Sequence, residues 1–72
     1  MPIMSLVRID GKKLRELRQK RLLSREELAE RANTHRDHIG RLERNAIKEP
    51  QMRTIRNIAE ALEVDPSEFL ID

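Results

Sequence analysis

The chain has 72 residues, which leaves room for one small domain. It contains no Cys, and this excludes disulfides, thiolate catalysis and Cys-based zinc sites and fits a reducing cytoplasm. The net charge of +2 hides an uneven distribution, because all 15 Lys and Arg lie between Arg8 and Arg56 and five acids with no base follow them. This polarity favours a basic surface that meets a polyanion, although a solvated helical surface explains the same charges equally well.

The composition favours an all-α fold, because Leu, Ala, Glu and Arg dominate and there are only one aromatic residue and two Gly. No stretch alternates polar and apolar residues well enough to require a sheet. The sequence shows no long apolar run and no charged-then-apolar leader, so we expect neither a membrane span nor a targeting segment. Without a Cys staple, so small a core needs tight helix packing or dimerisation.

Residues 1–8, MPIMSLVR, are apolar and include a Pro. They fit either a flexible lead or an extended arm that packs on the chain's own core or on a partner subunit, and the sequence does not choose between the two. We expect residues 9–72 to form the folded domain.

The first predicted helix covers about Lys12–Arg21, and Asp10 before it can act as its cap. Leu14 and Leu17 face inward at helical spacing, and Arg18 lies one turn beyond Leu14 on the same side. A charged residue on a core-facing stripe needs a partner of opposite charge.

The second predicted helix begins after Ser24, a good N-cap, and Glu27 three residues later completes a capping box. Leu23 before the cap and Leu28 after it can form the accompanying hydrophobic staple. Asn33 follows this helix and tolerates the left-handed backbone that ends many helices.

The third predicted helix starts near Thr34 or His35 and ends at Asn45, again a residue that tolerates the left-handed backbone. Ile39 and Leu42 face inward. Its other faces carry polar groups that suit a DNA groove: His35, Arg36, Asp37, His38, Arg41 and Arg44. Two short helices joined by a tight turn, the second rich in such groups, form a helix-turn-helix pattern.

A fourth helix is predicted over about Met52–Leu62. Its buried stripe consists of Met52, Ile55, Ile58, Ala59 and Leu62. The run DPSE at residues 65–68 then combines an N-cap, a Pro at the first helical position and an acid that closes the box. It predicts a short fifth helix that carries Phe69 and Leu70.

The run LSREELAERANTHRDHIGRLERN at residues 23–45 resembles the helix-turn-helix of Cro and the phage repressors, the Xre-type family. The flanking LRELR before it and PQMRTIRNIAEALEV after it are similar to the same family. The resemblance covers roughly residues 9–70, and its parts occur in the family's order. It implies a compact five-helix lambda-repressor-like DNA-binding domain.

The resemblance also pairs Arg18 with Glu43, because in this family an Arg in the first helix contacts a Glu late in the third. Two separate surface charges are the alternative. Leu22 stands where the family usually has Gly, and since a left-handed Leu would be strained, we expect the first helix to end differently here. Arg25 replaces a frequent Gln that touches phosphate, and Arg can make this contact more strongly.

A recognition helix presents its N-terminal residues to base edges in the major groove. Arg36 or Arg41 can bind guanine through O6 and N7, and the resemblance points to positions 36, 37 and 41 as those that read bases. Asp37 can accept a hydrogen bond from cytosine N4, orient Arg41 through an i,i+4 pair, or act as a capping or dipole acid at the helix start. The alternative for Arg36 is a plain surface charge.

Phosphate contacts are expected from Arg25, Arg44 and Lys48, with His38 as a further candidate. Such contacts fix the register of a protein on DNA and supply salt-dependent affinity without reading sequence. For Lys48, a merely solubilising role explains the residue equally well.

Neither metal nor enzyme chemistry is expected. His35 and His38 stand three apart, a spacing that can hold a metal, but only Asp37 offers a third ligand, so we expect no metal and no other cofactor. The sequence shows no glycine-rich phosphate loop and no nucleophile–base set, and a small helical chain offers little pocket. We expect no small-molecule ligand domain either.

The leading hypothesis is a sequence-specific, repressor-like transcriptional regulator that binds double-stranded DNA as a homodimer on a palindromic operator. We expect the dimer contact at the acidic C-terminal end, with Phe69, Leu70 and Ile71, helped by the N-terminal arm. The family also includes antitoxins and restriction-modification controllers, which are alternatives within DNA binding. A protein-interaction module is a further alternative, but the exposed faces of the third helix carry no aromatic or Met anchors.

Overall fold

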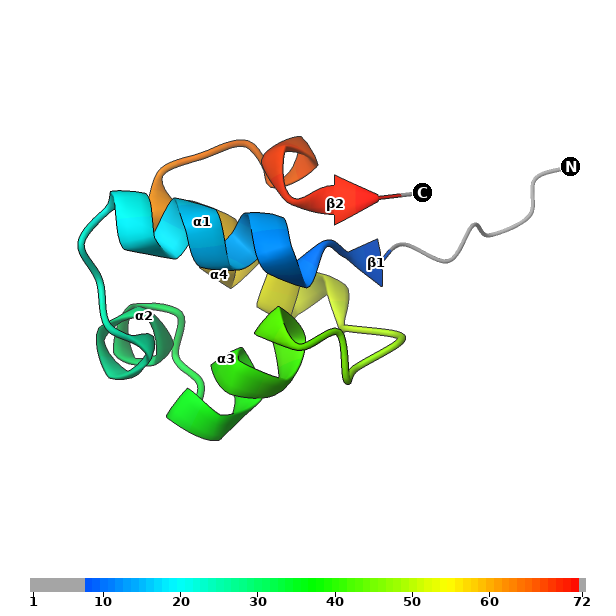
Figure 1. The fold of residues 1–72 in the computed structure, drawn as a ribbon, viewed down its shortest axis with the longest axis horizontal. Helices are drawn as coiled ribbons and strands as arrows, with labels where there is room; N and C mark the ends of the chain where they lie inside the picture. Colours follow the sequence, from blue (N-terminus) through cyan, green and yellow to red (C-terminus); the bar gives the residue numbers. More distant parts are fainter. Residues whose placement is uncertain (1–7, 72) are drawn as a thin grey trace, which may run out of the picture.

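The structure is a computed structural model that describes residues 8–71, and it is built mostly of helices (Figure 1). The expected N-terminal arm therefore lies outside the described residues, except for Arg8. The elements in chain order are β1 (Arg8–Ile9), α1 (Gly11–Lys20), α2 (Arg25–Arg31), α3 (Arg36–Glu43), α4 (Met52–Leu62), the 3-10 turn η1 (Pro66–Glu68) and β2 (Leu70–Ile71).

The prediction of a fifth α-helix is wrong, because the chain forms only the single 3-10 turn η1 there. The turn begins as predicted: the Asp65 carboxylate accepts a hydrogen bond from the Ser67 backbone N–H at 2.9 Å, which lowers the pKa of Asp65. It stops at once because the Phe69 side chain enters the core and the Phe69 carbonyl accepts a hydrogen bond from the Asp10 N–H at 2.8 Å. The described residues thus contain four α-helices.

A two-stranded antiparallel sheet, which the sequence did not predict, joins the two ends of the described chain. β1 pairs with β2 through Arg8 opposite Ile71 and Ile9 opposite Leu70. Strands of two residues are too short to produce an alternating pattern, so periodicity could not reveal them.

One hydrophobic core lies between the helices and the sheet. α1 packs on α3, and α2 packs on both α3 and α4; Figure 1 shows α1 in front of α4, with α2 and α3 together on one side of this pair. Most residues that were predicted to face inward are buried. Met52 is an exception at 57% exposed, because it lies at the first position of α4, one turn before Ile55 enters the core.

Phe69 is part of this core, with 1% of its surface exposed. The expectation that Phe69 contributes to a dimer contact is therefore wrong. Such a large apolar side chain is the natural closing group for a core with no other aromatic residue, since its burial removes more apolar surface from water than any aliphatic side chain here can.

The start of α1 is anchored on the end of α3. The Gly11 N–H donates a hydrogen bond to Asn45 Oδ1 at 2.8 Å. A Cβ atom at Gly11 would lie 2.6 Å from the carbonyl oxygen of Leu42, so only glycine permits this close approach. Asn45 itself takes the left-handed conformation that the sequence predicted, with φ 59°.

All four α-helices end at a residue in the left-handed conformation: Leu22, Asn33, Asn45 and Glu63. The expectation that the first helix ends differently is wrong, because Leu22 has φ 58°. The N–H groups of Leu22 and Leu23 donate to the carbonyls of Gln19 and Arg18 at 2.9 and 3.1 Å, which is the Schellman pattern. The buried Leu23 holds this turn against the core, while the side chain of Leu22 is 89% exposed.

We expect Leu22→Gly to stabilise the protein by about 1 kcal/mol, because a left-handed non-glycine residue costs about 1–2 kcal/mol and the exposed Leu has little packing to lose. Urea unfolding of both proteins measures the difference in the free energy of unfolding. Asn33→Gly is the control and should change this free energy much less, since Asn tolerates the left-handed region. A Leu22→Gly protein no more stable than the parent would contradict the strain.

Candidate nucleic-acid interface

α2 and α3 form the two helices of the predicted helix-turn-helix. The predicted capping box is present, since Ser24 Oγ accepts a hydrogen bond from the Glu27 N–H at 3.0 Å and Glu27 Oε1 accepts one from the Ser24 N–H at 2.8 Å. The bond from the Ser24 backbone lowers the pKa of Glu27. Between the helices, the Thr34 N–H donates to the Ala29 carbonyl at 2.8 Å. Leu28 and Ala29 on α2 are buried, and so is Ala32 at the start of the turn, which fixes the turn to the core.

The outer face of α3 is strongly basic. The Arg36 and Asp37 side chains are 62% and 84% exposed, and Arg41 and Arg44 are also exposed. Together with α2 they surround a shallow hollow of about 220 Å³, which we call the arginine hollow. It is lined by Arg25, Arg36, Asp37, Gly40, Arg41 and Arg44. Four arginines around one hollow create a positive potential that attracts phosphate groups.

Arg36 contacts two carboxylates on this face. Its Nη1 lies 3.5 Å from Oε2 of Glu26 on α2, and its Nε lies 4.0 Å from Asp37 Oδ1. Sequence reasoning missed Glu26 because only the turn between α2 and α3 brings residues ten positions apart into contact. No local pattern in the sequence signals such a pair.

The structure narrows the three interpretations of Asp37. α3 begins after His35, which makes no side-chain cap hydrogen bond, so the capping box between Thr34 and Asp37 does not form. Within residues 8–71, Asp37 also forms no ion pair with Arg41. Asp37 thus lies in the first turn of α3, where a negative charge is favourable to the helix dipole and open to a hydrogen-bond donor from outside.

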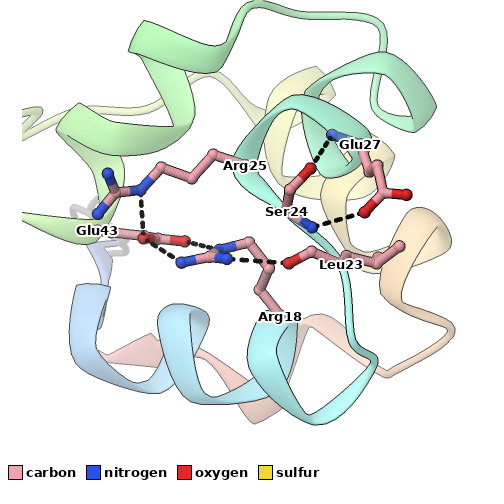
Figure 2. A network of polar contacts seen from close by, with 6 residues as sticks. All are labelled: Arg18, Leu23, Ser24, Arg25, Glu27 and Glu43. Atoms are coloured by element: carbon pink, nitrogen blue, oxygen red, sulfur yellow. Dashed lines mark hydrogen bonds and ion pairs between the residues drawn. The ribbon is translucent and has the colours of Figure 1, made fainter.

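Behind the exposed face, a buried carboxylate connects α1, α2 and α3 (Figure 2). Arg18 donates from Nε to Glu43 Oε2 at 2.6 Å and from Nη2 to Glu43 Oε1 at 3.1 Å. Arg25 Nε donates to the same Oε1 at 3.1 Å, and Arg18 Nη1 donates to the Leu23 carbonyl at 2.9 Å. The two residues that the resemblance pairs therefore lie together, and the Glu43 side chain is only 1% exposed.

Arg25 contacts the buried carboxylate of Glu43 and also lines the arginine hollow. Its Nε faces Glu43 on the inside, while its side chain remains 40% exposed and lines the arginine hollow. Sequence reasoning placed Arg25 on phosphate but missed the contact with Glu43, because the family's Gln at this position suggested no ion pair.

Two other residues that were expected to bind phosphate, His38 and Lys48, do not line the arginine hollow. His38 is half-buried, and its Nε2 is shielded from solvent with no hydrogen-bond partner among the described residues. The buried Nε2 atom is therefore not placed to donate to a phosphate. Lys48 is exposed in the loop between α3 and α4, where it borders a different hollow together with Ile9 and Ile71.

Residues 8–71 show neither a cluster of metal ligands nor a membrane-spanning helix. Among residues 8–71, no group of three His, Cys, Asp or Glu side chains is placed to hold a metal ion, and this includes the surroundings of His35 and His38. No helix in the same part is long and apolar enough to cross a bilayer.

The geometry of α2 and α3 agrees with what the comparison of the sequence with protein families shows. The sequence model of the helix-turn-helix family matches residues 14–69, which include all four arginines of the arginine hollow. The chain belongs to this family. The resemblance to the Xre-type helix-turn-helix is thereby confirmed. None of the curated proteins compared matches the chain.

Solved structures support this membership. The restriction-modification controller protein C.AhdI from Aeromonas hydrophila is 36% identical, with a TM-score of 0.76, over 81% of this helix-turn-helix chain and 83% of that one. The P22 c2 repressor protein, solved in complex with synthetic operator 9T, is 20% identical, with a TM-score of 0.76, over 83% and 89% of the two chains. At that identity the likeness shows the fold.

A hydroxyethylphosphonate dioxygenase is also similar, with 31% identity and a TM-score of 0.74. The match covers 90% of this chain but only 14% of the dioxygenase. The likeness is therefore confined to a small segment of that enzyme, and it does not extend dioxygenase chemistry to this helix-turn-helix protein.

We expect Glu43→Ala to destabilise the protein by about 3–5 kcal/mol, because it leaves the buried Arg18 guanidinium without its counter-charge. Arg25→Ala is the matched control: it keeps the pair between Arg18 and Glu43 and removes a partly exposed partner, so we expect a loss of about 1 kcal/mol or less. Urea unfolding at neutral pH compares the variants. Equal losses in both would show that the pair between Arg18 and Glu43 has no special weight.

Proposed function

We propose that this protein is a sequence-specific, repressor-like transcriptional regulator that acts in the cytoplasm and inserts α3 into the major groove of double-stranded DNA. The observation that carries this proposal is the outer face of α3 in a member of the helix-turn-helix family. Arg36, Arg41 and Arg44 are exposed there on a helix whose inner face is locked into the core. Arginine is the side chain best suited to both guanine and phosphate.

The positions on α3 support a division of roles. Arg36 and Asp37 occupy the first turn, and Arg41 lies one turn past Asp37, so we propose that these three meet base edges. Arg25 and Arg44 lie around the same hollow and suit phosphates on either side of the groove. Lys48 borders a different hollow, and a solubilising role explains it equally well.

Two features favour DNA over a protein as the partner of this face. The large apolar side chains that are exposed in the described residues are Leu22, Met52 and Ile71, and none of them lies on α3. The acidic residues after Arg56 follow the basic region in sequence, so the charges of the chain are segregated. A polyanion meets the basic region with attraction and the acidic end with repulsion, which favours one orientation.

A restriction-modification controller is a second candidate for the same DNA-binding activity. The observation that favours it is the 36% identity with C.AhdI over most of both chains. The two candidates differ in the genes that the protein controls, and not in how α3 would bind. Mapping of bound sites across the genome separates them, since a controller binds beside restriction and modification genes.

We expect Arg36→Ala to lower the affinity for a duplex selected from random DNA by about 1–3 kcal/mol and to relax the base preference at one position. The affinity of the unaltered protein should fall steeply as salt rises, because phosphate contacts release counterions. Gel-shift titrations at several salt concentrations measure both effects.

Arg56→Ala is the control for Arg36→Ala, because Arg56 is exposed on α4 beside Glu60 and Glu63 and away from the arginine hollow. It should change the affinity little. A loss from Arg36→Ala that is equal on all sequences would instead assign Arg36 to phosphate. Failure of the unaltered protein to select any sequence, or binding insensitive to salt, would contradict the proposed function.

We further propose that the protein binds DNA as a homodimer, with two copies of α3 spaced about 34–36 Å apart along the duplex. With Phe69 in the core, the C-terminal side chains left for a contact are the half-buried Leu70 and Ile71, which is 48% exposed. We expect sedimentation at micromolar concentration to show a dimer, and Ile71→Asp to weaken it. A strict monomer would contradict both the dimer and a palindromic operator.

A further inference from the structure

The acid on α2 that contacts the recognition helix suggests a role in selectivity. Arg36 is the first residue of α3, and it lies between Asp37 on its own helix and Glu26 on α2. Glu26, Arg36, Asp37 and His35 line a common hollow of about 330 Å³ at this edge of the molecule. A guanidinium that is expected to meet DNA is therefore flanked by two carboxylates from two different helices.

These contacts add little to the stability of the fold. The side chains of Glu26, Arg36 and Asp37 are 71%, 62% and 84% exposed, and the two distances of 3.5 and 4.0 Å are long for ion pairs. Exposed pairs of this kind contribute little, because water and salt screen them. The two contacts therefore act mainly on the direction of the Arg36 side chain and on the charge around it.

We propose that Glu26 is a specificity-determining residue that keeps Arg36 from pairing with phosphates in non-specific complexes. This inference rests on the proposed function. A phosphate that approaches Arg36 also meets the carboxylates of Glu26 and Asp37, and like charges at this distance repel. A guanine edge carries no net charge and presents two acceptors to a guanidinium, so it does not suffer the same repulsion. Glu26 thus penalises backbone binding more than base reading.

The test is the variant Glu26→Gln, which removes the charge and keeps the length of the side chain. Two duplexes serve as probes: one that the unaltered protein selects from random DNA, and a scrambled duplex of the same composition. We expect the affinity for the scrambled duplex to rise several-fold. Its slope of log K against log salt should steepen by about 0.9, which corresponds to one more phosphate neutralised. Affinity for the selected duplex should rise less, so the ratio of the two affinities falls.

Glu60→Gln is the matched control, because Glu60 is exposed on α4, away from the arginine hollow, and loses the same charge. It should leave the slope and the ratio unchanged. Equal effects of the two variants would overturn the role of Glu26, while the proposed function would stand as long as the unaltered protein still prefers its selected duplex.

The background of Arg36→Ala tests whether Glu26 acts through Arg36. In that background, Glu26→Gln should no longer steepen the salt slope. A slope change that persists would show that Glu26 acts on phosphates bound by residues other than Arg36, and it would overturn the proposed role. Glu26 also lies in the first turn of α2, where an acid favours the helix dipole. Urea unfolding reports that effect separately, because a purely structural role would not change the ratio of two affinities.

Discussion

The structure depends on one buried carboxylate. Glu43 lies at the last position of α3 with 1% of its side chain exposed, and it accepts hydrogen bonds from Arg18 on α1 and from Arg25 on α2. A buried carboxylate is costly unless geometry and hydrogen bonding compensate for the lost water, and here two guanidinium groups do so. Because the network joins three helices at one point, it holds the end of α3 in place against α1 and α2. The exposed face of α3 is therefore positioned by residues that lie behind it.

A second anchor acts at the same end of α3. Asn45 ends the helix in the left-handed conformation and accepts a hydrogen bond from the Gly11 N–H, so the start of α1 and the end of α3 are joined. Four helix ends use a left-handed residue, and none of them is Gly. Leu22 and Glu63 are strained there, and such positions persist only where the surroundings over-determine the backbone. The burial of Leu23 after Leu22 provides this in the first of them.

The structural features that the sequence predicted correctly are those that depend on residues close together in the chain. The capping box at Ser24, the bounds of α4 and the left-handed Asn33 and Asn45 follow from short-range chemistry, and the structure contains them. The features that the sequence did not predict depend on contacts between distant segments of the chain. The two-residue strands, the burial of Phe69 and the contact between Glu26 and Arg36 arise only when distant segments meet. The conformational preference of Leu predicted that Leu22 would avoid the left-handed region, but tertiary packing holds it in that region.

The arrangement separates stability from recognition at almost every position of α3. Ile39 and Leu42 are buried and hold the helix, whereas Arg36 and Arg41 are exposed and can change with little effect on the core. Arg25 on α2 combines the two roles, because its Nε donates to Glu43 while the rest of its guanidinium borders the arginine hollow. A phosphate that binds Arg25 would therefore draw on a group that also compensates the buried carboxylate. Since Arg18 alone still makes two hydrogen bonds to Glu43, the core can tolerate this sharing. Binding at the surface can therefore be coupled to the buried network through Arg25.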